Sequence, residues 1–239
     1  MNALITGASR GIGRAIAVRL ASRGGQVVVN YLSNEEAAQE TAALVREAGG
    51  EPLVVQGNVR DRRDLERLAD AMDRVDVLVH NAAMGVLKPA SEIRANQWDL
   101  TLESSVRPFW QLTSLCLDKM PRGSSVVGIS SLGSRGYVPG YAAMGAAKAA
   151  MEALTRQLAA ELGPQGIRVN TVCGGLVDTD ALHYFPDREK MMATAEKLTP
   201  LGRVGQPEDI AQAVELLLLP QASWITGHVL VADGGLSVV

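Results

Sequence analysis

The stretch Thr6-Gly7-Ala8-Ser9-Arg10-Gly11-Ile12-Gly13 follows a short apolar run and opens a segment with helical periodicity. Gly7 permits a tight turn, while Gly11 and Gly13 leave room where backbone approaches a pyrophosphate or packs against a sheet. The first turn of such a helix presents free N–H groups and the positive end of its dipole to a phosphate. We therefore expect a dinucleotide-binding turn whose cofactor contacts are Gly7, Ser9, Arg10, Gly11, Ile12 and Gly13.

Apolar runs rich in β-branched residues recur along the rest of the chain, with helical segments between them. Strands are predicted near Ala3–Thr6, Val27–Asn30, Leu53–Gln56, Val75–His80, Ser125–Ser130, Arg168–Val172 and Val229–Ala232. Helices are predicted near Gly11–Arg23, Asn34–Ala48, Asp61–Met72, Gln97–Lys119, Tyr141–Leu162 and Pro207–Leu219. This alternation predicts a Rossmann-like α/β fold, a doubly wound parallel sheet of about seven strands. No break in composition divides the chain, so residues 1–239 are expected to form a single domain.

Composition excludes several classes of function. The net charge of −3 argues against nucleic acid or an anionic membrane as an obligatory partner. No apolar run is long enough to span a bilayer, and the N-terminus enters a strand without room for a signal peptide. The two cysteines, Cys116 and Cys173, and the three scattered histidines have no metal-type spacing. These features predict a cytoplasmic protein without a metal site.

The end of the second predicted strand indicates which dinucleotide binds. An acid there would accept hydrogen bonds from the adenosine ribose of NAD, but the chain reads Asn30-Tyr31-Leu32-Ser33-Asn34, with no acid before Glu35. Arg10 supplies a cation for a 2′-phosphate, so NADP(H) is favoured. Further contacts are expected where later strands reach the same sheet edge: Asn30, Tyr31, Asn58, Val59, Asn81, Ala82 and Ala83.

A second stretch carries the reactive groups. Residues Ser130 to Ala149 read SSLGSRGYVPGYAAMGAAKA and pass from a strand end through a Gly/Pro-rich loop into a helix. The stretch holds a hydroxyl pair, two tyrosines and Lys148. An ammonium close to a phenol stabilises its ionised form, so Lys148 assists proton donation from a tyrosine.

The glycine turn, Asn81-Ala82-Ala83, the Ser130/Ser131 strand end, Lys148 and Asp233-Gly234-Gly235 together resemble the short-chain dehydrogenase/reductases along essentially the whole chain. In that family the catalytic tyrosine usually lies four residues before the lysine. Here that position is Met144, and the nearest candidate is Tyr141. Seven residues make almost two helical turns, which would place Tyr141 and Lys148 on one face, about 10 Å apart along the axis.

The Tyr-x6-Lys spacing resembles the NADPH-dependent enoyl-[acyl-carrier-protein] reductases of type III. The segments Ile129–Ser134, Asn81–Leu87, Gly174–Glu189 and Thr199–Arg203 share this likeness. The resemblance implies hydride transfer to the β-carbon of an enoyl thioester, with Tyr141 stabilising the enolate oxygen. It also implies that Lys148 bonds the nicotinamide ribose. In ketoreductase relatives the residue matching Ser131 helps to bind the substrate carbonyl.

A further departure lies in the long helix that begins near Gln97. The family usually places an asparagine seven residues after a tryptophan such as Trp98, and this asparagine helps to hold a water in a proton relay behind the lysine. In this chain the position is Ser105, which either holds a displaced water or fills a small gap in the packing. Ser105 is therefore a fourth catalytic candidate, with Tyr141, Lys148 and Ser131.

Downstream residues are expected to complete the site. By resemblance Gly174, Val177 and Thr179 contact the nicotinamide carboxamide, and the long helices near Gln97–Lys119 and Tyr141–Leu162 pair subunits in a homotetramer. The segment 180–199 places apolar residues among charges, so we expect either a mobile lid over a hydrophobic substrate or a surface helix with an ordinary core-facing stripe. The candidate substrate contacts are Tyr137, Met144, Leu182 and Phe185.

Three functions remain open on these residues. The first is an NADPH-dependent enoyl thioester reductase, with the substrate carried by a protein or by coenzyme A. The second is a ketoreductase acting on a β-keto or polyketide-type substrate. The third is a cofactor-binding protein without catalysis, which Met144 and Ser105 favour and which the joint presence of Tyr141 and Lys148 opposes.

Overall fold

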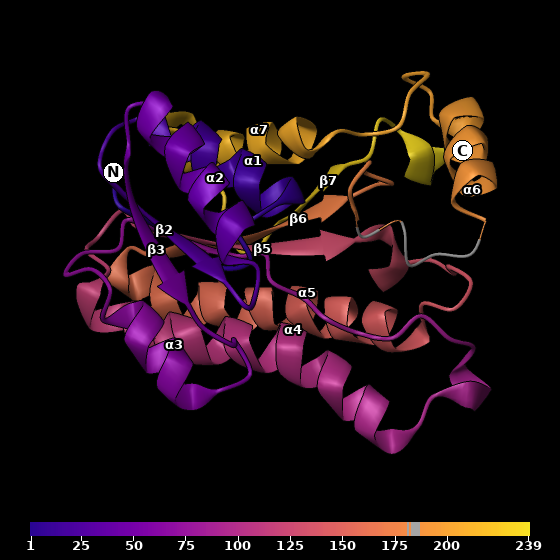
Figure 1. Ribbon diagram of the computed structural model, residues 1–239, viewed down its shortest axis with the longest axis horizontal. Helices are drawn as coiled ribbons and strands as arrows, with labels where there is room; N and C mark the ends of the chain where they lie inside the picture. The colour runs from indigo at the N-terminus through magenta and orange to yellow at the C-terminus, as the bar shows by residue number, and fades with distance from the viewer. Residues whose placement is uncertain (181, 183–186) are drawn as a thin grey trace.

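A computed structural model describes residues 1–180, 182 and 187–239 of the chain. A single seven-stranded sheet lies between two layers of helices (Figure 1). The sheet order is β3-β2-β1-β4-β5-β6-β7, and all six strand pairs are parallel. The strands are β1 (Ala3–Ile5), β2 (Gln26–Tyr31), β3 (Glu51–Gln56), β4 (Val77–His80), β5 (Ser125–Ser131), β6 (Arg168–Gly174) and β7 (Val229–Ala232). The predicted doubly wound Rossmann-like fold is confirmed.

The helices cover the sheet from both sides. Helices α1, α2 and α7 lie on one face, and α3, α4 and α5 lie on the other (Figure 1). Their bounds are α1 (Gly11–Ala21), α2 (Glu35–Glu47), α3 (Arg62–Ala69), α4 (Ala95–Cys116), α5 (Ala142–Leu162), α6 (Arg188–Leu198) and α7 (Pro207–Leu218). Short 3₁₀ turns include η3 (Leu132–Ser134), which follows β5, and η7 (Leu236–Val238).

Alternation along the strands builds a separate core on each face. In β2, Val27 and Val29 join the core beneath α1 and α7, whereas Val28 joins the core beneath α3, α4 and α5. Burial on both faces explains why these strands read as unbroken apolar runs. Phe109 and Met151 are fully buried in the second core, and they fix α4 and α5 against the sheet.

The strand order reverses between β1 and β4, and this reversal positions the site. Crossovers leave from β1 and β4 to opposite sides of the sheet, and sheets of this kind bind their ligands in a crevice at the carboxyl ends of such a strand pair. The glycine turn follows β1, Asn81 follows β4, and Ser131 ends β5 next to them. The segments singled out in the sequence therefore converge on one edge.

The structure refines two predicted elements. Tyr141 is not inside a helix: it is the N-cap residue of α5, and its carbonyl accepts a hydrogen bond from the Gly145 N–H at 2.6 Å. Residues 188–198, expected within a lid segment, form helix α6, in which only Ala195 is buried. Among the described residues, none of the helices combines the length and the apolar character that crossing a bilayer requires.

Candidate active site

The glycine turn has the geometry that close backbone approach requires. Gly7 and Gly11 adopt positive φ angles of 63° and 55°, which favour glycine. A Cβ atom at Gly13 would overlap the Gly7 carbonyl, so the first turn of α1 packs directly on the loop. The N-cap residue of α1 is Arg10, whose side chain makes no capping hydrogen bond. The backbone N–H groups at the start of α1 thus remain available for an anion.

Asn30 holds this turn from the end of β2. Its side chain is buried, accepts a hydrogen bond from the Gly7 N–H at 3.0 Å and donates to the Gly57 carbonyl at 3.0 Å. Asn81 acts similarly from β4, donating to the Thr6 and Gly7 carbonyls at 3.1 and 3.0 Å. Both side chains are turned into the protein, so they shape the cofactor crevice through the backbone of the glycine turn.

The remaining cofactor candidates around β2 and β3 differ in exposure. Tyr31 and Val59 are buried, whereas Asn58 is half-buried and its carboxamide oxygen accepts from the Arg60 N–H at 3.0 Å. Ala82 and Ala83 follow Asn81, and the Ala82 N–H donates to the Thr6 hydroxyl at 3.0 Å. These contacts fix the backbone that borders the crevice on its β4 side.

Arg10 has a partner that the sequence did not reveal. Its guanidinium lies 3.7 Å from the Asp180 carboxylate, and both side chains are more than half exposed. An exposed pair of this kind contributes little to stability. Because the pair is weak, a phosphate dianion can displace the carboxylate. Asp180 brings the start of the 180–199 segment to the glycine turn.

Tyr141 lies against the turn that follows β5. A Cβ atom at Gly133 would overlap the Tyr141 ring, so this glycine provides the surface on which the ring rests. Burial raises the pKa of the Tyr141 phenol, and a side-chain hydrogen bond with Ser131 opposes that rise. The structure therefore brings two of the catalytic candidates, Tyr141 and Ser131, into contact, which spacing in the sequence did not predict. A raised phenol pKa keeps the hydroxyl protonated and able to donate.

Met144, at the position that the family gives to tyrosine, is directed elsewhere. A Cβ atom at Gly85 would overlap the Met144 sulfur, which shows that the thioether packs on the loop after β4. The same loop pairs with the end of the Tyr141 loop through a bridge between Lys88 and Tyr141. Met144 thus fastens the β4 loop beside the site. Tyr137, by contrast, is 90% exposed on the loop before Tyr141.

Lys148 is buried beneath the site. Its Nζ donates to the Ile129 carbonyl of β5 at 2.7 Å, and burial lowers the pKa of its ammonium to about 8. An ammonium with such a pKa is partly deprotonated slightly above neutrality, so it exchanges protons readily.

His80 and Ser105 lie behind Lys148. His80 Nε2 is 2.9 Å from the Ser105 carbonyl and therefore carries the proton, while Nδ1 lies 3.4 Å from the Thr6 hydroxyl. Burial, followed by repulsion from Lys148, lowers the pKa of His80 to about 3, so the imidazole is neutral. The Ser105 hydroxyl is buried and has no hydrogen-bond partner among the described residues. An unpartnered hydroxyl here fits a water site near the lysine better than simple gap filling.

The end of β6 closes the crevice opposite β4. Gly174 is buried, Val177 pairs with Gly205 in a short bridge, and the Thr179 side chain faces Gly11. Leu182 is also buried, and its N–H donates to the Thr179 carbonyl at 3.0 Å. Phe185, the remaining substrate candidate, lies outside the described residues. The structure therefore brings Thr179 and the glycine turn together, as a shared cofactor site requires.

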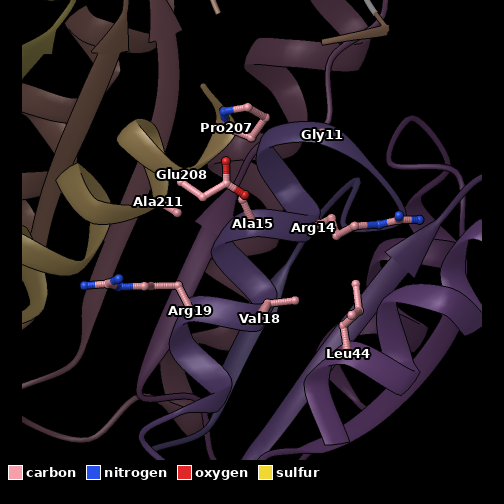
Figure 2. A pocket seen from close by; sticks show the side chains of 9 residues that line it. All are labelled: Gly11, Arg14, Ala15, Val18, Arg19, Leu44, Pro207, Glu208 and Ala211. Atoms are coloured by element: carbon pink, nitrogen blue, oxygen red, sulfur yellow. The ribbon is translucent and has the colours of Figure 1, made fainter. Parts of the chain in front are cut away.

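A groove in the helical layer formed by α1, α2 and α7 is separate from this crevice. Figure 2 shows it running along α1 between Leu44 of α2 and the start of α7 at Pro207, Glu208 and Ala211. Of the predicted site residues only Gly11 borders the groove. None of the catalytic candidates reaches it, so the groove is a feature of the helix packing.

Sequence reasoning missed three groups that contact the site. Asp180 pairs with Arg10, His80 bonds the Ser105 carbonyl, and Glu152 accepts hydrogen bonds from Ser130 and Ser134. Only Glu152 had a readable signal, because it follows Lys148 by four residues on one helix face. The other two contacts join segments far apart in the chain.

Comparison with known proteins agrees with this arrangement. Residues 7–237 match the family model described as enoyl-(acyl carrier protein) reductase. The chain is 41% identical, over 99% of its length and 86% of the relative, to 1-cyclohexenylcarbonyl-CoA reductase of Streptomyces collinus.

Two solved ketoreductase structures share the fold. The reductase LugOII, which catalyses keto-reduction at C1 during lugdunomycin biosynthesis, is 34% identical with a TM-score of 0.91, covering 98% of this chain and 97% of its own. The angucycline C-6 ketoreductase LanV, with bound NADP, is 30% identical with a TM-score of 0.92, covering 100% and 96%. The chain therefore belongs to the short-chain dehydrogenase/reductases and is an oxidoreductase of that family.

Proposed function

We propose that this protein is an NADPH-dependent reductase of enoyl thioesters. The observation that carries the proposal is the position of Tyr141, which caps α5, bonds Ser131 and rests on Gly133, while Met144 is turned toward Gly85. A donor one turn earlier than usual is displaced relative to the nicotinamide. This displacement suits an enolate oxygen, three bonds from the carbon that accepts hydride, better than a ketone oxygen on that carbon itself.

The described residues fit a bound NADPH. The first turn of α1 would hold the pyrophosphate, Arg10 the 2′-phosphate, Lys148 the nicotinamide ribose, and Val177 with Thr179 the carboxamide. LanV, which shares the fold, contains NADP. When bound, the cofactor supplies the hydride.

The protein's own residues stabilise the negative charge that develops on the substrate oxygen. As hydride reaches the β-carbon of an enoyl thioester, negative charge develops on the thioester oxygen, and the Tyr141 hydroxyl donates a hydrogen bond to it. Lys148 stabilises the charge that shifts onto the phenol, and Ser131 keeps the hydroxyl aimed. A proton from solvent water then adds to the α-carbon as the negative charge leaves the oxygen, which gives the saturated thioester. Ser105 and the neutral His80 complete the polar surroundings behind Lys148.

The relatives include reductases of both candidate substrate classes, enoyl thioesters and ketones. The name of the Streptomyces collinus relative describes reduction of a cyclohexenylcarbonyl thioester of coenzyme A, and the family model carries an enoyl reductase description. LugOII and LanV are ketoreductases, and they support the second candidate, reduction of a β-keto or polyketide-type ketone. In that reaction Tyr141 delivers its proton to the alkoxide oxygen.

Deuterium transfer from 4-deuterated NADPH, prepared with each C4 stereochemistry, separates the two reactions. We expect turnover of crotonyl-CoA or 1-cyclohexenylcarbonyl-CoA, with deuterium at the β-carbon of the saturated product. Parallel reactions with acetoacetyl-CoA and an aromatic ketone compare ketones with enoyl thioesters. The same crotonyl group on a pantetheine-linked carrier protein compares the protein carrier with coenzyme A. Reduction of ketones, with no turnover of any enoyl thioester, would overturn the enoyl proposal in favour of ketoreduction.

Arg10 is expected to determine the preference for NADPH. Removing its charge in Arg10→Ala should raise KM for NADPH by about 10- to 100-fold, the loss expected for a charge-assisted hydrogen bond. KM for NADH should change by less than about threefold, because NADH has no 2′-phosphate. Steady-state kinetics with both cofactors tests this, and NADH is the internal control. An equal change for both would remove Arg10 from phosphate recognition.

We further propose that residues 180–199 form a lid over the substrate. Helix α6 buries only Ala195, so an ordinary core-facing helix does not describe it, and it is tied down by Arg188 bonding Asp178 at 2.8 Å. Proteolysis that slows at this segment when substrate and cofactor are bound would support a lid, and unchanged cleavage would contradict it.

The assembly proposed is a homotetramer. A groove between α4 and α5 is bordered by apolar side chains, including the half-exposed Trp110 and Leu154. Glu103 and Arg107 also line this groove, and exposed apolar side chains with a polar rim of this kind support the proposal that α4 and α5 pack against another subunit. Light scattering should give a mass of about four chains of 25.3 kDa. A monomeric mass would contradict this assembly.

A further inference from the structure

Glu152 is a buried carboxylate that the reaction as described does not use. It lies on α5, four residues after Lys148, and its side chain is 9% exposed. Its Oε1 accepts hydrogen bonds from the hydroxyls of Ser130 at 2.7 Å and Ser134 at 2.6 Å. Its Oε2 lies 3.2 Å from Arg135 Nε. A carboxylate removed from water is retained where its acceptors are all engaged, as they are here.

The two serines bracket the turn on which Tyr141 rests. Ser130 lies immediately before Ser131, and Ser134 ends η3. Between these two anchors are Ser131, which bonds the Tyr141 phenol, and Gly133, which lies against the Tyr141 ring. These two contacts of the tyrosine therefore belong to a five-residue segment whose ends are held by one carboxylate oxygen.

The same segment is also held from α5 itself. A Cβ atom at Gly145 would lie 2.5 Å from the Gly133 carbonyl, so helix and turn are in direct backbone contact. This contact limits how far the turn can approach α5, and the serine bonds to Glu152 limit how far it can move away. Together they define one position for the support beneath Tyr141.

We infer that Glu152 is a positioning residue of the reaction, which sets the place of the Tyr141 hydroxyl by anchoring the Ser130–Ser134 segment at both ends. The inference depends on the proposed role of Tyr141 as the group that meets the substrate oxygen. It applies equally to enoyl and to keto reduction, because the same hydroxyl serves both.

The role needs a carboxylate in particular. Both serine hydroxyls donate to Oε1, and Arg135 donates toward Oε2, so every neighbour is a donor. A glutamine amide of the same size offers one acceptor and one donor, and it must turn its NH₂ either to the serines or to Arg135. Glu152→Gln therefore keeps the packing but either turns its NH₂ to the serines and breaks their bonds, or keeps these bonds in weakened form and loses the Arg135 ion pair, because a neutral amide oxygen is a weaker acceptor than a carboxylate.

The experiment compares Glu152→Gln with Glu161→Gln, an exposed glutamate on the same helix, and with Tyr141→Phe. On whichever substrate the wild-type protein reduces, Glu152→Gln should lower kcat by about 10- to 100-fold, as expected for a donor displaced by up to about 1 Å. The dissociation constant for NADPH should stay within about twofold, because the glycine turn is untouched. Glu161→Gln should match the wild type.

A pH profile separates positioning from general weakening of the fold. The groups that face the Tyr141 phenol are Ser131 and Cys173, with Lys148 deeper on α5. Loss of the Ser131 bond leaves the phenol pKa higher, so the alkaline titration of the Tyr141 phenol, followed by ultraviolet absorbance with Tyr141→Phe as the blank, should move to higher pH in Glu152→Gln. The phenol is followed directly because the pH dependence of the rate also contains the ionisation of Lys148 at about pH 8. A merely structural defect would lower the rate with the phenol titration unmoved.

Ser134→Ala removes one anchor and keeps the carboxylate with its other partners, so it tests the inference if Glu152→Gln folds poorly. It should lower kcat by about 3- to 10-fold, the equivalent of one hydrogen bond, without changing NADPH binding. If Tyr141→Phe loses activity while Glu152→Gln and Ser134→Ala keep wild-type kcat and pH profile, the inference about Glu152 fails and the role of Tyr141 stands. If Tyr141→Phe keeps its activity, the proposed function of Tyr141 fails first.

Discussion

Replacing Tyr141 by phenylalanine is expected to lower kcat by about 10²- to 10³-fold, the loss that follows removal of one donor to a developing oxyanion. The ring would still rest on Gly133, because the substitution removes only the hydroxyl that Ser131 bonds. Binding of NADPH should change by less than about twofold, since no step of cofactor recognition uses the phenol. Steady-state turnover and a fluorescence titration with NADPH measure the two effects.

Tyr137→Phe provides the matched comparison. Tyr137 lies four residues earlier and is 90% exposed, so loss of its hydroxyl should cost far less than loss of the Tyr141 hydroxyl. An unchanged rate in Tyr141→Phe with a large loss in Tyr137→Phe would transfer the donor role to the loop tyrosine. Retained activity in both single variants and in the double variant would mean that neither tyrosine is the donor.

The second large effect concerns Lys148. Lys148→Met should lower kcat by about 10²-fold or more, because it removes the charge that assists the phenol. The cofactor-free protein should at the same time become more stable at pH 7, by about 2 kcal/mol. The lowered pKa, about 8 instead of 10.5, implies a cost of about 3 kcal/mol for burying the ammonium, and leaving the Ile129 carbonyl unpaired offsets about 1 kcal/mol of the gain.

The sign of the pH dependence follows from linkage. Between pH 8 and pH 10.5 the unfolded chain holds a proton on Lys148 that the folded protein has lost, so stability rises with pH in this window. The advantage of Lys148→Met should therefore shrink as pH rises from 8 to 10. Urea unfolding at pH 7 and pH 10 measures it, with Lys197→Met on the exposed side of α6 as control. A variant less stable than the wild type by the same amount at both pH values would contradict the buried ammonium.

Local sequence signals predicted most of the fold. Each strand run and its flanking helix could be read from composition and periodicity, because a sheet buried on both faces needs continuous apolar strands. The glycine turn was equally readable, since Gly13 can be replaced by no residue with a Cβ atom. The sequence-based expectation for α5 began one residue too early, at Tyr141, because an N-cap residue is already half helical.

The contacts that shape the site were not readable in the same way. Glu152 and Ser130 are 22 residues apart, and His80 and Ser105 are 25 residues apart. Only the packing of α4 and α5 beside the sheet brings them together. Met144 illustrates the same limit: spacing showed that it replaces a tyrosine, but not that its sulfur lies against Gly85. The roles assigned to Tyr141, Lys148, Ser131 and Ser105 remain predictions for the variants above.

Because His80 is buried and neutral, the free energy of unfolding depends on pH through a group inside the candidate site. From pH 6.5 down to about pH 3 this imidazole is protonated in the unfolded chain but stays neutral in the folded chain. Each unit of acidification across that range shifts up to about 1.4 kcal/mol toward unfolding through this one group. Acid therefore destabilises the domain through its surface carboxylates and also through His80, which bonds the Ser105 carbonyl of α4 behind Lys148.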